Sequence, residues 1–125
     1  MDSEVLIAAA NRGELARVKE IIQGMKTNGV DINHQKYGKT ALMEACFNGH
    51  KEVALELLKV DGIDVNIQSS GGWTALMWAC IHGHKEVALE LLEVDGIDVN
   101  IQSSGGWTAL IFVCFKGHAS RAAEG

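Results

Sequence analysis

The sequence repeats itself at a fixed interval of 34 residues. The tripeptide Thr-Ala-Leu occurs three times at this interval, beginning at Thr40, Thr74 and Thr108. Residues 49–76 and 83–110 are identical at 27 of 28 positions, with Lys59 opposite Glu93 as the one difference. A period of this size predicts stacked structural units, each of which buries its apolar face against its neighbours. Recent duplication or deliberate design explains the near-identity better than independent drift does.

Each unit is predicted to hold two short helices and an extended segment. Residues 74–81 are typical of a helix that Thr74 can cap, and Gly83 suits the left-handed backbone that ends it. In residues 85–92 one helix face is apolar, formed by Val87, Ala88, Leu91 and Leu92. An extended segment then leads into a Ser-Ser-Gly-Gly turn at 103–106.

The order of motifs in each unit resembles the ankyrin repeat. The residues on which this resemblance rests are Gly-Trp-Thr-Ala-Leu-Met-Trp-Ala-Cys, then Gly-His, Leu-Leu and Asp-Val-Asn. The resemblance covers nearly the whole chain. It implies an all-α solenoid of stacked helix pairs joined by extended β-turn loops, in a single domain spanning 1–125. The units are expected at 1–33 (an N-terminal capping repeat), 34–67, 68–101 and 102–125 (a truncated repeat).

The sequence departs from the family pattern in three ways. Alanine replaces the proline that usually opens the first helix, at Ala41, Ala75 and Ala109. The usual histidine is replaced at Met43, Met77 and Ile111, so its hydrogen bond is expected to be absent. The first unit has a longer loop through residues 24–29.

Charge and composition exclude several classes of partner. The chain carries 16 acidic and 11 basic residues, for a net charge of −5, which offers no electrostatic footprint for nucleic acid or an anionic membrane. No apolar run approaches the roughly 18–20 residues that span a bilayer, and the start lacks a basic signal sequence. The three cysteines form no disulfide framework. We expect a cytoplasmic or otherwise intracellular location.

No residues point to catalysis, a metal or a cofactor. Equivalent cysteines lie roughly 10 Å apart in stacked repeats, beyond the about 7 Å that a disulfide allows, so they are interpreted as small packing residues. The histidines of the Gly-His pairs are equally far apart. The resemblance implies that they bond to loop backbone groups. These histidines are His50, His84 and His118. An enzyme is not expected.

Two asparagines support two readings. Asn66 and Asn100 close the Asp-Val-Asn motifs, and their amides are expected to tie the extended segments together. With a leucine eight positions before each, both also match a pattern resembling ankyrin-repeat sites that asparaginyl hydroxylase modifies. Hydroxylation is therefore a hypothesis for both.

The resemblance implies that a protein partner binds the turn tips and the first helices. The expected tip residues are Lys36, Tyr37, Lys39, Ser70, Trp73, Ser104 and Trp107. The expected helix residues are Glu44, Phe47, Trp78, Ile81, His82, Phe112 and Phe115. Aromatic side chains are typical interface anchors. For the tip tryptophans the alternative is that they only cover the turn glycines.

The C-terminal unit departs from the repeat after Gly117-His118. The Val, Leu and Leu expected to cover the last core layer are absent from the sequence. Three apolar residues are then expected to be partly open: Ile111, Val113 and Phe115. Exposed apolar surface favours self-association, so we predict a homodimer through this end.

These observations favour a non-catalytic protein–protein interaction module with a partner of unknown identity. The alternative is a structural or engineered scaffold, or a fragment, with no biological partner. Near-identical repeats and the abrupt end favour the alternative. The divergent helix positions Glu44, Trp78 and Phe112 and the irregular loop at 23–30 favour a natural protein.

Overall fold

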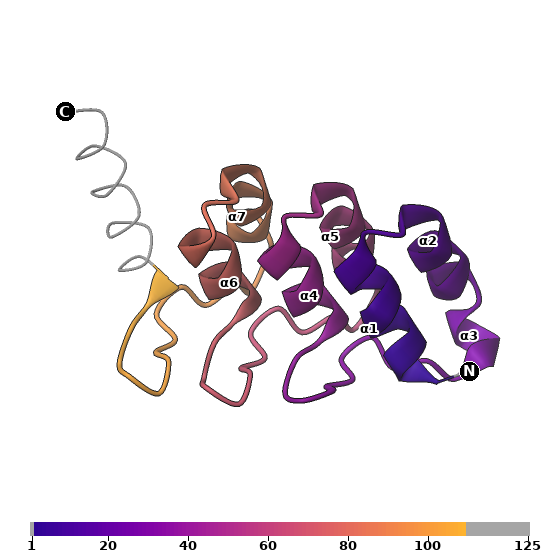
Figure 1. Ribbon diagram of the computed structural model, residues 1–125, viewed down its shortest axis with the longest axis horizontal. Coiled ribbons are helices and arrows are strands. Elements are labelled where there is room, and N and C mark those ends of the chain that lie inside the picture. The colour runs from indigo at the N-terminus through magenta and orange to yellow at the C-terminus, as the bar shows by residue number, and fades with distance from the viewer. Residues whose placement is uncertain (1, 110–125) are drawn as a thin grey trace.

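The protein is a stack of helix pairs. A computed structural model describes residues 2–109, in which there are seven helices and no strand. The helices are α1 (Ser3–Arg12), α2 (Leu15–Gln23), α3 (Met25–Asn28), α4 (Ala41–Asn48), α5 (Lys51–Leu58), α6 (Ala75–Ile81) and α7 (Lys85–Leu92). Figure 1 shows α1, α4 and α6 side by side, α2, α5 and α7 in a second row, and the connecting loops projecting to one side. The expected all-α solenoid is confirmed.

Helices α4 and α6 begin at threonine caps, as predicted. The Thr40 hydroxyl accepts a hydrogen bond from Met43 N at 3.2 Å, and the Thr74 hydroxyl accepts one from Met77 N at 3.3 Å. These bonds satisfy backbone donors that a helix start leaves open. The hydrogen bond of the usual histidine was expected to be absent, and at Met77 the side chain makes a bond of its own in that place. Its sulfur accepts from Thr74 N at 3.5 Å, because the side chain folds back over the cap.

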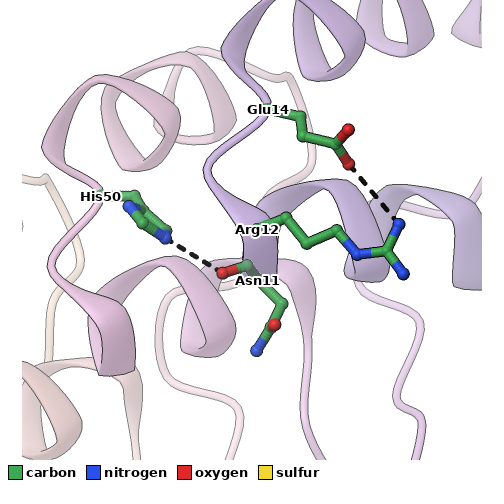
Figure 2. A network of polar contacts seen from close by, with 4 residues as sticks. All are labelled: Asn11, Arg12, Glu14 and His50. Carbon is green, nitrogen blue, oxygen red and sulfur yellow. Dashed lines mark hydrogen bonds and ion pairs between the residues drawn. The ribbon is translucent and has the colours of Figure 1, made fainter.

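Helices α1 and α4 each end at a glycine that a histidine of the next repeat covers. Gly49 has a φ of 72°, and a Cβ placed there would lie 2.6 Å from the His84 ring. The His84 ring nitrogen Nε2 bonds to the Phe47 carbonyl at 3.0 Å, and His50 bonds to the Asn11 carbonyl in the same way (Figure 2). The histidines were expected to bond to loop groups. The acceptors of His50 and His84 are instead carbonyls of the last helical turn, which lack a partner within the helix, and His118 lies outside the described residues.

The core runs through the stack without interruption. Helix α4 packs between α1 and α6, and α5 packs between α2 and α7. Large side chains at equivalent positions are fully buried, among them Leu42, Leu57, Leu76 and Leu91. Each repeat therefore completes the apolar core of its neighbour, as stacked repeats require.

Cys46 and Cys80 lie in this core as free, buried thiols. Burial raises the pKa of the Cys80 thiol to about 11, and it raises the pKa of Cys46 further. Both side chains are therefore protonated near neutral pH, as apolar packing residues are.

The loop expected at 24–29 contains a helix. Residues Met25–Asn28 form α3, which ends at Gly29 with a φ of 74°. The Asn28 amide donates to the Ile21 carbonyl at 3.1 Å, and its oxygen accepts from Val30 N at 2.9 Å. These bonds fix the backbone between α2 and Val30.

Candidate protein-binding face

The first projecting loop ends in a tight hairpin, here called tip 1 (residues 36–39). Lys36 and Lys39 exchange two backbone hydrogen bonds of 2.9 and 3.0 Å. Between them, Tyr37 and Gly38 have φ angles of 54° and 78°, the pattern of a type I′ turn. Tyrosine is unfavourable at such an angle, by about 1 kcal/mol or more. Tip 1 therefore holds a strained tyrosine whose side chain is 89% exposed.

The second and third loops end in a different turn, at tip 2 (residues 69–73) and tip 3 (residues 103–107). In tip 2, Ser69 N donates to the Trp73 carbonyl and Gly72 N donates to the Ser69 carbonyl, both at 2.8 Å. Gly72 has a φ of 81°, as in a type I turn with a glycine bulge. A Cβ on Gly71 would lie 3.3 Å from the Trp73 ring, so this indole does lie beside its turn glycine.

Asparagine side chains join the loops of successive repeats. The Asn33 amide donates to the Gly62 carbonyl and its oxygen accepts from Asp64 N, both at 2.9 Å. Asn66 makes the same two bonds with the next repeat at 2.8 Å each. The structural role expected for Asn66 is confirmed, and hydroxylation of Asn66 or Asn100 stays a prediction.

Glutamines form a second ladder nearer the tips. The Gln35 amide donates to the carbonyls of Gly38 and Gln68, at 2.9 and 3.1 Å. The Gln68 amide donates to those of Gly72 and Gln102, at 2.9 and 3.0 Å. The two ladders hold the tips at a fixed spacing, so the face that they form is preorganised.

Aromatic side chains from three elements meet where the tips join the helices. We call Phe47 of α4, Trp73 of tip 2, and Trp78 and His82 at the α6 end the aromatic cluster. The Trp78 ring centroid lies 5.2 Å from that of Phe47 and 4.5 Å from that of Trp73. The Phe47 and His82 centroids are 4.4 Å apart. The cluster is only partly buried and so presents rings on the surface.

Lys39 places a positive charge on this cluster. Its Nζ lies 5.0 Å from the Phe47 centroid and 5.1 Å from the Trp78 centroid, within cation–π range. The other lysine of tip 1 differs, because Lys36 pairs with the Glu4 carboxylate at 3.4 Å. Between residues 2 and 109, no carboxylate lies within ion-pair distance of Lys39.

Trp78 contributes a second polar donor. Its indole Nε1 is buried and has no hydrogen-bond acceptor among the described residues. A buried donor without an acceptor is unfavourable by about 1–3 kcal/mol. Such a group is unusual in a native protein. The indole N–H of Trp78 is therefore a donor to which the described fold supplies no acceptor.

A shallow pocket of about 240 Å³ lies between α1, tip 1 and α4. Lys36, Tyr37 and Glu44 line it, as does Arg12, whose guanidinium is 3.9 Å from Glu14 (Figure 2). Its remaining lining residues are Glu4, Ile7, Ala8 and Asn11. Sequence reasoning missed the contribution of α1. Counting back from Gly13 as from Gly49 would have found Ala8, Asn11 and Arg12 at the positions of Glu44, Phe47 and Asn48.

The remaining predicted residues are spread along the same side. Ile81 is partly buried at the end of α6, while Ser70 and Ser104 are exposed in tips 2 and 3. Trp107 of tip 3 is 43% exposed. Four predicted residues lie outside the described part of the chain: Ile111, Phe112, Val113 and Phe115.

Neither a metal site nor a membrane-spanning helix is found within residues 2–109. No three His, Cys, Asp or Glu side chains of this region lie close enough together to hold a metal ion. None of the described helices has the length and apolar character needed to cross a membrane.

Stacked helix pairs with hydrogen-bonded projecting loops define a helical repeat protein of the solenoid class. The family model for ankyrin repeats (3 copies) matches residues 2–69 and 62–123, and the chain belongs to this family. Ankyrin repeats are generally protein–protein interaction modules, and the family is generally non-catalytic.

A curated relative supports the assignment. Over 68 residues the chain is 40% identical to ankyrin repeat and KH domain-containing protein mask-1 of Caenorhabditis elegans. The aligned segment covers 54% of this chain and 2% of mask-1. The chain therefore matches only a small part of that protein.

Proposed function

We propose that the chain binds a protein partner, without catalysis, through what we call the recognition face: tips 1–3 and the exposed sides of α1, α4 and α6. The observation that carries this proposal is the aromatic cluster with Lys39 on its surface. Partly exposed tryptophans and a positioned cation are the kind of group that dominates binding energy at interfaces.

Preorganisation supports the proposal. The asparagine and glutamine ladders fix the loops, and the cluster is packed between two repeats. A rigid surface loses little conformational entropy when a partner binds, so more of the contact energy appears as affinity. We also propose that residues 1–125 form one ankyrin-repeat domain, as expected from the sequence.

The test is affinity capture with two matched variants. Trp78→Ala removes the central ring of the cluster, whereas Leu89→Ala removes an apolar side chain of α7 that is 61% exposed and lies off the recognition face. We expect proteins captured by the wild type to be retained by Leu89→Ala and lost with Trp78→Ala. Circular dichroism melting of all three proteins checks that the fold survives.

Capture that is unaffected by Trp78→Ala would place binding elsewhere on the molecule. Capture of nothing specific by the wild type would favour the alternative of a scaffold without a biological partner.

A further inference from the structure

The recognition face carries a cation that no acidic group of the described chain balances. Lys36 is paired with Glu4, and the carboxylate of Glu44 accepts a hydrogen bond from the Asn11 amide. The Lys39 ammonium group lies over the rings of Phe47 and Trp78 and has no ion-pair partner among residues 2–109. Its charge is therefore available to an anion from outside.

The ammonium group of Lys39 is also held in place. Its backbone forms one side of the tip 1 hairpin, and its side chain ends over the rings of Phe47 and Trp78 at 5.0 and 5.1 Å. A free surface lysine loses rotamer entropy when it is fixed by a partner. Lys39 has already lost part of this freedom, which favours binding of an anion at this point.

The surroundings of Lys39 restrict what kind of anion fits. Beside it lie the rings of Phe47 and Trp78, and Trp73 packs against Trp78, so the ligand must be apolar next to its negative charge. The unpaired Trp78 N–H is a second donor, and an acceptor can reach it only if a neighbouring side chain moves. The net charge of −5 disfavours a highly charged polyanion.

We propose that the partner presents an acidic peptide segment, in which a side-chain carboxylate pairs with Lys39 and an adjacent apolar side chain packs on the aromatic cluster. This inference rests on the proposed function and specifies its partner chemistry. The binding mode combines a charge-assisted hydrogen bond with ring burial at one point of the face.

The test begins with selection from a display library of random linear peptides, with the whole chain as bait. We expect the selected peptides to be enriched in Asp or Glu next to an aromatic or large aliphatic residue. Selected peptides are then synthesised with an amidated C-terminus, so that only side-chain carboxylates remain, and titrated by isothermal calorimetry.

Lysine variants separate the contribution of the Lys39 charge from that of a control lysine. Lys39→Met removes the charge and should weaken binding on the order of tenfold, while Lys39→Arg retains most of the affinity. Lys85→Met removes an exposed cation of α7, which lies off the recognition face, and should leave affinity within about twofold. Replacing the peptide's Asp or Glu by its amide should weaken binding to the wild type and not to Lys39→Met.

Peptides that require Trp78 but lack acidic residues, or that ignore Lys39→Met, would overturn this inference and leave the proposed function standing. Peptides that bind equally well to Trp78→Ala would count against the recognition face itself. A selection that yields no binder overturns the inference, because it requires a linear segment as the ligand.

Discussion

Single residues at the helix ends determine how one repeat fits on the next. Gly49 adopts a left-handed backbone and leaves room for the His84 ring, which in turn bonds to the Phe47 carbonyl. Gly13 and His50 repeat the arrangement one unit earlier. The glycine and the histidine of the recurring Gly-His pair therefore work together, because the glycine of one repeat leaves room for the histidine ring of the next.

Gly49→Ala should destabilise the protein by about 2 kcal/mol. A left-handed alanine is strained by about 1 kcal/mol, and the new Cβ would push the His84 ring off the Phe47 carbonyl. Gly62 is the matched control, because its φ is 86° but a Cβ there meets nothing within 4 Å. Gly62→Ala should lose about 1 kcal/mol. Urea unfolding measures both, and equal losses would contradict a special role for the glycine–histidine contact.

The Gly-His pairs and threonine caps could be predicted because each is a local pattern. The partner of each histidine could not, since the Phe47 carbonyl lies 37 residues before His84 and is reached only through the stacking. The Met77 sulfur bond was likewise missed, because it depends on how one side chain folds back over its own cap.

At the scale of elements, tip 1 stands apart from tips 2 and 3. Its two-residue turn puts Tyr37 at a positive φ, whereas in tips 2 and 3 the residues with a positive φ are the glycines Gly72 and Gly106. A residue that is both exposed and strained gives the fold no stability, so its side chain is explained better by binding than by packing.

Tyr37→Asn should raise stability and weaken binding. Asparagine tolerates the left-handed backbone, and Asn-Gly is a preferred type I′ turn, so the free energy of unfolding should rise by about 0.5–1 kcal/mol. Affinity for the captured partner should fall severalfold, because the exposed ring is lost. Tyr37→Phe keeps the ring and serves as the control. Unchanged affinity in Tyr37→Asn would remove tip 1 from the recognition face.

The periodicity predicted the paired helices well, because apolar spacing and caps recur in every unit. It did not predict α3, since four residues between Gly24 and Gly29 show no apolar period. The aromatic cluster was also out of reach. Phe47, Trp73 and Trp78 were each candidates, but their meeting depends on the packing of α4 against α6 and on the course of tip 2.

At the scale of the whole molecule, the described repeats form one continuous body with two different sides. The first-helix side carries the tips, the ladders and the aromatic cluster, while α5 and α7 carry charged side chains that include the 3.3 Å pair Lys51–Glu86. Self-association through Ile111, Val113 and Phe115 stays a prediction, because these residues lie outside the described part.

Partners are proposed to contact the recognition face. Hydrogen–deuterium exchange of the chain, measured alone and with a captured partner, tests it most directly. We predict that protection on binding appears in tips 1 and 2, α4 and α6, with α5 and α7 unchanged. Protection confined to α5 and α7, with tips 1 and 2 exchanging as in the free protein, would contradict the account.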